Sequence, residues 1–247
     1  QGKPPVYDRA ALNLNIVEKD ALRDKTDSYW RFLLSGKTVT WRDEIAGEIN
    51  VRTSVVSDPI LVKGNGQFLY TLASVIDDSD FGVTDVVRGI DHLTNTAVQI
   101  EIFRNLSAGL PVFGHHSLIV DNSGENFSKR SGSLSIKSLK EAGIEAGAIV
   151  SKLVSLGTGE GLDFKNNINE LTSKFELNKY STAPVKFEKE VLKTISRKLI
   201  ANLSVSEISP YLDLIGVPDN IKENFWIMAK DNINSKNDLV DIWNLCK

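Results

Sequence analysis

The segment from Asp85 to Gly132 constrains the fold of this chain more than any other, because its residue pattern changes from strand to helix and back. A short apolar run spans the start of this segment and is formed by Val83, Val86 and Val87. Such a run predicts a strand that is buried on both faces. Arg88 and Gly89 end the strand, and Leu110 to Val120 predicts a second one. The order strand, helix, strand favours an α/β fold.

A helix is expected between the two strands. Asp91 or Thr94 is its expected N-cap, and its apolar positions lie roughly on one side, at Val98, Ile100, Ile102, Phe103 and Leu106. After the second strand the chain opens into a polar loop with the sequence DNSGENFSKRSGS. Charged groups therefore gather where the strands end, and ligands of open α/β sheets bind at such carboxyl ends. The sequence thus predicts a ligand site at this edge of the sheet.

Two short motifs lie in this segment. The first consists of Val87-Arg88-Gly89, Asp91-His92, Asn95-Thr96 and Gln99, and the second is Phe127-Ser128-Lys129-Arg130. Their order and spacing resemble the class I glutamyl-tRNA synthetases of the bacterial type, in which the second motif is a form of the K-M-S-K-S loop. A weaker resemblance extends over nearly the whole chain, including Tyr29-Trp30-Arg31-Phe32 and Ala183-Pro184-Val185.

The resemblance implies a fold that is α/β plus all-α: the second half of a Rossmann-like class I catalytic domain, followed by a helical stem-contact and anticodon-binding region. From Leu134 onward the apolar positions follow helical spacing, which is typical of an all-helical half. Four domains are implied. They are the remainder of an insertion that binds the acceptor end (1–66), the second half of the nucleotide-binding fold (67–125), the K-M-S-K-S-like loop with a stem-contact domain (126–205), and the start of an anticodon-binding domain (206–247).

Composition limits the class of protein. The chain has 29 basic and 32 acidic residues, a formal charge of −3, which argues against a generally basic nucleic-acid coat but allows a local phosphate-binding surface. Cys246 is the single cysteine, so neither a disulfide framework nor a cysteine-rich zinc site is expected. No apolar run approaches the roughly 20 residues of a membrane span, and no signal peptide opens the chain. The expected location is the cytoplasm.

Lys129 is the first candidate for catalysis, with Ser128 beside it. Lys129 lies in a polar, glycine-flanked loop directly after a predicted strand, where a flexible ammonium group can reach phosphates. Amino-acid activation builds negative charge on the departing pyrophosphate, which a cation there stabilises. The alternative is an ordinary solvated surface loop. Asn126 stands where the family loop has its first lysine, which removes one positive charge.

Arg88 is the candidate for amino-acid binding. A charge at the end of a buried strand needs a partner, and the guanidinium fork suits a carboxylate. The resemblance implies the carboxylate of substrate glutamate, with Tyr70 and Ser74 beside it on one face of a helix. The alternatives are an internal partner for Arg88, such as Asp85 or Asp91, and a core position for Tyr70.

The resemblance also implies an ATP site formed by Lys129, Asp91, Gly89 and His115. An N-cap role would explain Asp91 equally well. His115 and His116 are adjacent on a predicted strand and point to opposite faces, so they are not expected to bind one metal ion together.

A class I synthetase needs a second signature, H-I-G-H or a variant, and the three histidines here do not form it. The chain also begins at Gln1 without a methionine. We therefore expect a fragment from the middle of a longer enzyme, without the N-terminal H-I-G-H half and the C-terminal end, that is inactive alone.

The expected function is that of a glutamate–tRNA ligase, which uses ATP, Mg²⁺, glutamate and tRNA, with no zinc site and no membrane. The full enzyme is expected to be monomeric, whereas the fragment is expected to self-associate through an exposed sheet edge. Two alternatives remain open: a non-catalytic RNA-binding module, and a glutamyl transferase that acts on a modified tRNA base. The second generally carries a cysteine-rich zinc site.

Overall fold

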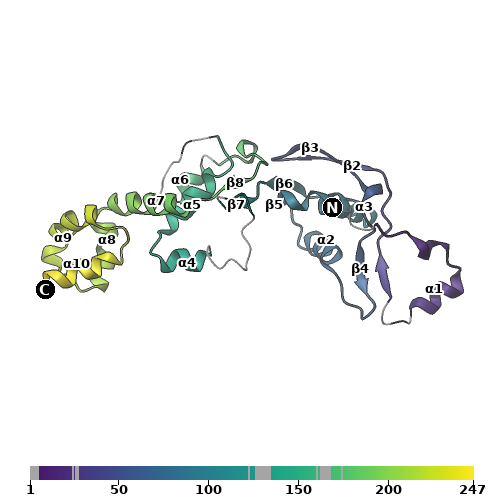
Figure 1. The fold of residues 1–247 in the computed structure, drawn as a ribbon, viewed down its shortest axis with the longest axis horizontal. Coiled ribbons are helices and arrows are strands. Elements are labelled where there is room, and N and C mark those ends of the chain that lie inside the picture. Colours follow the sequence, from purple (N-terminus) through teal and green to yellow (C-terminus); the bar gives the residue numbers. More distant parts are fainter. Residues whose placement is uncertain are drawn as a thin grey trace. The chain divides into compact units, whose positions relative to one another are not determined.

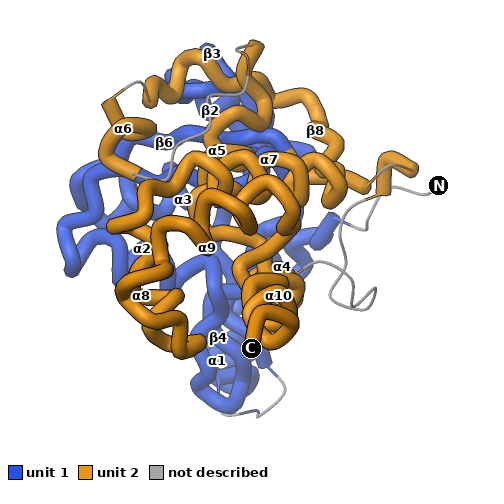
Figure 2. Tube along the Cα trace, turned by 90° about the vertical axis from the view of Figure 1, so that its left-hand side faces the viewer, with its two compact units in different colours: residues 1–117 blue, residues 118–247 orange. Residues whose placement is uncertain are grey.

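The structure is a computed structural model that describes residues 6–23, 25, 28–121, 123–125, 135–159, 161, 168–173 and 175–247. The chain forms two compact units, residues 1–117 and 118–247, which are coloured separately in Figure 2. The domain boundaries expected after residues 66, 125 and 205 stay predictions.

Unit 1 is built around a four-stranded sheet with the strand order β3-β2-β6-β5 (Figure 1). Strands β2 (Thr38–Asp43) and β3 (Gly47–Arg52) form an antiparallel hairpin. Strands β5 (Asp85–Gly89) and β6 (Val112–His116) are parallel, and they are joined through helix α3 (Leu93–Asn105). The predicted order strand, helix, strand is therefore confirmed, and α/β is the class of this unit.

Strand β2 connects the hairpin to the parallel pair. Its burial alternates residue by residue, because successive side chains of a strand point to opposite faces. Val39, Trp41 and Asp43 point inward. Asp43, the last residue of β2, pairs in parallel with Phe113 of β6. An acidic side chain is thereby placed inside the unit at the end of a strand.

Helix α3 is the centre of the core of unit 1, since eight successive residues from Thr96 to Phe103 are buried. Helix α2 (Tyr70–Asp80) packs against it. The helix that the resemblance implied for Tyr70 and Ser74 is therefore present. The buried apolar core is formed by Leu34, Val39, Trp41, Val75, Ala97, Val98, Ile100, Ile102, Phe103 and Phe113.

Three local expectations in this unit are wrong. Strand β5 is not buried on both faces, because it is the edge strand of the sheet and Val87 is 49% exposed. Neither Asp91 nor Thr94 caps α3: a 3₁₀ turn (Ile90–His92) leads into the helix, whose N-cap is His92 without a side-chain capping bond. The second strand is also shorter than expected and ends at His116.

The first part of unit 1 is a small module of helices and strands. The ion pair between Arg9 and Asp58, at 2.8 Å, holds two of its loops together. Its elements are a 3₁₀ turn (Ala10–Asn13), α1 (Ile16–Arg23), β1 (Tyr29–Arg31), a 3₁₀ turn (Thr53–Val55) and β4 (Ile60–Lys63), with β1 and β4 paired antiparallel.

Unit 2 is mainly helical, as the spacing of its apolar residues predicted. Its helices are α4 (Ile136–Glu141), α5 (Ala146–Ser155), α6 (Ile168–Thr172), α7 (Lys189–Ala201), α8 (Val205–Leu214), α9 (Lys222–Ala229) and α10 (Asp238–Cys246). It also has 3₁₀ turns at Leu177–Lys179, Asp219–Ile221 and Lys230–Asn232. The expectation of an all-helical half is corrected by one short parallel pair, β7 (Ile119–Val120) with β8 (Val185–Lys186).

Helix α7 contributes to two apolar clusters of unit 2. Leu192, Ile195 and Leu199 belong to the cluster that includes α5, and α5 and α7 lie side by side (Figure 1). Ile200 belongs to the cluster of α8, α9 and α10. No helix in the described part of the chain is long and apolar enough to cross a membrane.

Candidate functional site

Arg88 lies at the end of β5 and is held by neutral groups. Its Nη1 donates to the hydroxyl of Tyr70 at 3.1 Å. Its Nη2 donates to Oγ1 of Thr96 at 2.5 Å and to Oε1 of Gln99 at 2.6 Å. The Nε atom is buried and has no hydrogen-bond partner among the described residues. Within the same residues, no carboxylate forms an ion pair with Arg88, so the internal partners considered above, Asp85 and Asp91, do not pair with it.

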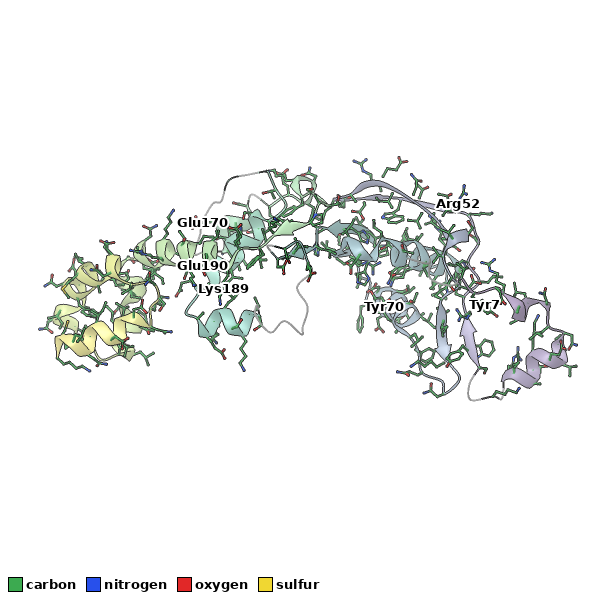
Figure 3. All side chains as sticks on the ribbon, in the orientation of Figure 1. Tyr7, Arg52, Tyr70, Glu170, Lys189 and Glu190 are labelled. Carbon is green, nitrogen blue, oxygen red and sulfur yellow. The ribbon has the colours of Figure 1, made fainter. Side chains whose placement is uncertain are left out.

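Helix α2 brings Tyr70 and Ser74 to the same place. Gln99 donates from Nε2 to Oγ of Ser74 at 2.7 Å, while its Oε1 accepts from Arg88. Tyr70, which Figure 3 labels, is 54% exposed and makes an edge-on ring contact with His92 at 6.2 Å between centroids. Because the two α2 residues are four apart, they share one helix face. The structure therefore brings together Arg88, Tyr70 and Ser74. The alternative, a core position for Tyr70, is wrong because the side chain is exposed.

A buried pair lies behind Arg88. Nδ1 of His115 lies 2.5 Å from Oδ2 of Asp43, and Nε2 lies 2.8 Å from Oγ1 of Thr96. Both members of the Asp43–His115 pair have side chains with no exposure. The ring of His115 also contacts the rings of Trp41 and Phe113. Asp43 is the residue of this cluster that sequence reasoning missed.

Asp43 also fixes the backbone around it. Its Oδ1 accepts from the backbone N–H groups of Ile45, Ala46 and His115, at 3.1, 2.9 and 2.9 Å. The indole of Trp41 donates to Oδ2 at 3.3 Å. One carboxylate therefore closes the turn between β2 and β3 and attaches it to β6. Buried carboxylates are found where hydrogen bonds replace their hydration.

These contacts determine the charges of the pair. Burial raises the pKa of Asp43, but hydrogen bonds from Ala46, His115 and Ile45 outweigh it, so the pKa lies below its ordinary value. Burial lowers the pKa of His115 below its ordinary value, although Asp43 opposes this effect. At neutral pH Asp43 is therefore a carboxylate and His115 is a neutral imidazole.

The other predicted site residues lie nearby or outside the described residues. Gly89 ends β5 and pairs with His116. Asp91 is exposed in the turn before α3, with its carboxylate 4.0 Å from His92. His115 is buried and His116 is exposed, as expected for neighbours on a strand. The predicted ATP contacts of Gly89, Asp91 and His115 stay predictions. Lys129, Ser128 and Asn126 lie outside the described residues.

Comparisons with known proteins agree with the motifs. Residues 3–194 match the family described as "tRNA synthetases class I (E and Q), catalytic domain". The chain is 45% identical over 247 residues to glutamate–tRNA ligase 2 of Ruegeria sp. (strain TM1040), and 41% identical over 247 residues to glutamate–tRNA ligase 1 of Roseobacter denitrificans. Both alignments cover 100% of this chain and 56% of the relative. The chain thus spans little more than half the length of these relatives.

The fold is also similar to solved structures. A glutamate tRNA ligase from Elizabethkingia meningosepticum, solved in complex with its amino acid, has a TM-score of 0.79 at 24% identity, over 95% of this chain and 52% of that one. A glutamate-tRNA synthetase from Elizabethkingia anophelis has a TM-score of 0.77 at 23% identity, over 94% and 52%. At these identities the likeness concerns the fold. Since the family match covers well over half of the residues, the chain belongs to the class I tRNA synthetases (E and Q).

Proposed function

We propose that the natural protein that carries this sequence is a glutamate–tRNA ligase. It activates glutamate with ATP and transfers it to the 3′ end of tRNA. The relatives that match along the whole chain bear this name. One observation on the chain's own residues supports the proposal most directly: Arg88 is held only by neutral groups among the described residues, and its Nε is buried without a partner.

The groups that hydrogen-bond to Arg88 are neutral, so they fix the position of its positive charge without neutralising it, and the carboxylate of Asp78 acts on that charge without forming an ion pair. Tyr70, Thr96 and Gln99 fix the plane of Arg88, and its remaining charge favours an anion that arrives with the ligand. Carboxylates match the fork of guanidinium donors. In the proposed complex the carboxylate of glutamate takes this position, and Tyr70 and Ser74 contact the same ligand.

The proposed reaction proceeds in two steps. The α-carboxylate of glutamate attacks the α-phosphorus of ATP, and pyrophosphate leaves with its bonding electron pair. The terminal hydroxyl of tRNA then attacks the activated carbonyl, and AMP leaves. Lys129 stabilises the charge on the departing pyrophosphate, Ser128 donates its hydroxyl to the phosphates, and Gly89, Asp91 and His115 belong to the ATP side of the site. The rest of the catalysis is positioning of the substrates.

Several features of the proposal remain predictions. Mg²⁺ is predicted as the ion that accompanies ATP. Within the described residues no group of three or more His, Cys, Asp and Glu side chains is placed to hold a metal ion, and we assign no step to one. A monomeric state and a cytoplasmic location are likewise predictions.

Pyrophosphate exchange tests the activation step. The natural protein that carries this sequence should transfer labelled pyrophosphate into ATP when glutamate is present, and not when glutamine or aspartate replaces it. A protein that binds tRNA but shows no glutamate-dependent exchange would be an RNA-binding module, and the proposal would be wrong.

The transfer step needs a separate assay. Labelled glutamate should appear on intact tRNA and not on tRNA from which the 3′-terminal adenosine has been removed. Labelling of the shortened tRNA would instead identify a transferase that acts on a base.

A further inference from the structure

Four side chains are joined in series by hydrogen bonds across unit 1. They are Asp43 at the end of β2, His115 on β6, Thr96 on α3 and Arg88 on β5. The bonds measure 2.5 Å, 2.8 Å and 2.5 Å in that order. Asp43, His115 and Thr96 are 2%, 0% and 0% exposed. The series therefore runs through the buried interior and ends at the ligand-binding arginine.

The donors of this series have one consistent direction. A carboxylate only accepts hydrogen bonds, so Nδ1 of His115 carries a proton and donates a hydrogen bond to Asp43. In a neutral imidazole the other nitrogen is then an acceptor, so the hydroxyl of Thr96 donates to Nε2. The oxygen of Thr96 has its lone pairs free to accept from Nη2 of Arg88. Each bond in the series follows from the preceding one.

The opposite tautomer would turn the hydroxyl of Thr96 to another acceptor. With a proton on Nε2, His115 would donate to Thr96, whose hydroxyl would have to turn to the backbone carbonyl of His92 at 3.2 Å. The oxygen of Thr96 would then accept from His115 and Arg88 at once. The state of the imidazole thus decides which way the hydroxyl of Thr96 points, and whether its oxygen accepts from Arg88 alone or from His115 as well.

We propose that His115, oriented by Asp43, is a positioning residue that fixes the hydroxyl of Thr96 and through it the guanidinium of Arg88. The inference rests on the proposed function, in which Arg88 binds the carboxylate of glutamate. It gives Asp43, which lies 45 positions before Arg88 in the sequence, a part in glutamate binding although its side chain is buried. A purely structural pair would stabilise unit 1 without affecting the orientation of Arg88.

Two substitutions of one residue separate these roles. In His115→Gln the side-chain amide reaches the position of Nε2 and offers Thr96 an acceptor oxygen. In His115→Asn the shorter amide reaches only the position of Nδ1, where it donates to Asp43 and leaves Thr96 without an acceptor. Both variants lose the imidazole ring and the packing of that ring. His115→Gln keeps the bond to Thr96 and loses the bond to Asp43, whereas His115→Asn does the reverse, so a comparison between them shows on which of the two bonds glutamate binding depends.

Glutamate binding is the decisive measurement. In the natural protein that carries this sequence, the Michaelis constant for glutamate should be roughly fivefold to tenfold higher in His115→Asn than in His115→Gln, which corresponds to one hydrogen bond. Their melting temperatures should be alike. Equal Michaelis constants for the two variants, or a higher one for His115→Gln, would overturn the proposal.

Two further measurements complete the test. In wild-type chain, long-range ¹H–¹⁵N correlation spectra should show His115 as the Nδ1–H tautomer, and Asp43→Asn should increase the Nε2–H form. A wild-type ring with the proton on Nε2 would overturn the proposal even if neither His115 variant folds. Arg88→Ala serves as the reference: if its glutamate binding equals that of the wild type, the proposed function fails, whereas if Arg88→Ala binds weakly and the His115 variants bind alike, only the positioning role fails.

Discussion

The imidazole of His115 donates to the carboxylate of Asp43, although 72 residues separate the two in the sequence. Their contact depends on the sheet, because β2 pairs in parallel with β6 at Asp43 and Phe113. The same carboxylate accepts the backbone N–H of His115. The pairing of the strands and the hydrogen bonds of Asp43 thus support each other. Because both Asp43 and His115 titrate, their contact also makes the stability of unit 1 depend on pH.

The stability of unit 1 should decrease as the pH falls below about 6.5. Burial lowers the pKa of His115 from its ordinary value of 6.5, so just below that pH the unfolded chain binds more protons than the folded chain. The free energy of unfolding therefore falls with decreasing pH. The pKa of Asp43 is lowered from 3.8, so the free energy of unfolding falls further when the pH drops below about 4.

Urea unfolding at about pH 7.5 and about pH 5.5 checks this linkage. The signal to follow is the methyl resonance of Ala97, which lies in the core of unit 1. The control is His115→Gln, in which the difference between the two pH values should shrink. A wild-type unit 1 that is equally stable at both pH values would contradict the prediction.

Replacing Arg88 by alanine should weaken glutamate binding more than it weakens the fold. The loss of a bond to a charged group predicts a Michaelis constant for glutamate roughly 10 to 100 times higher. The fold should lose less than the roughly 3–5 kcal/mol that follows when a buried ion pair is broken, because the partners left behind are neutral. Steady-state kinetics and thermal melts measure both quantities. Arg104→Ala, an exposed position at the end of α3, is the matched control, and a large drop in melting temperature with an unchanged Michaelis constant would exclude the substrate role.

Replacing Lys129 by alanine should slow activation without changing glutamate affinity. Removal of one group that stabilises charge in a transition state typically lowers the turnover number by about 100-fold to 1,000-fold. Lys137→Ala is the matched control, because that lysine is exposed on α4. Its Nζ lies 3.9 Å from Oε1 of Glu141, so the substitution removes the same kind of charge from an ordinary surface ion pair. The assay is pyrophosphate exchange with the natural protein that carries this sequence. An unchanged turnover number would count against the role of Lys129.

Gly143 should tolerate alanine less well than Gly216 does. Both glycines have positive φ angles, +73° and +80°, so a side chain costs roughly 1–2 kcal/mol at either position. At Gly143 an added Cβ would also lie 2.7 Å from Cβ of Ser235, whereas at Gly216 nothing lies within 4 Å. The extra crowding should add about 1–3 kcal/mol. Urea unfolding of unit 2 in the two variants measures the difference, and equal losses would show that Ser235 moves aside freely.

The sequence was sufficient to predict the central βαβ element. The motif around Arg88 and the expected helix face of Tyr70 and Ser74 also predicted side chains that the structure brings together, and their role in binding stays a prediction. The exposure of Val87 could not be predicted, because an apolar run has the same pattern in an edge strand and in a central one.

The sequence contains a weak indication that Asp43, which sequence reasoning missed, is buried. Val39, Trp41 and Asp43 alternate with polar residues, and such a period of two marks an inward-facing row. An acidic residue in that row indicates a buried partner. That partner, His115, lies on a strand far along the chain, and local patterns do not specify which distant strands pair.

Helix α7 has a practical consequence for anyone who wishes to produce parts of unit 2 separately. A division before α7 takes Leu192, Ile195 and Leu199 away from the cluster around α5, and a division after it takes Ile200 away from the cluster of α8 to α10. Each truncation would expose large aliphatic side chains to water. A soluble fragment therefore has to retain α7, and the apolar residues of α7 that lose their partners have to be replaced by polar ones.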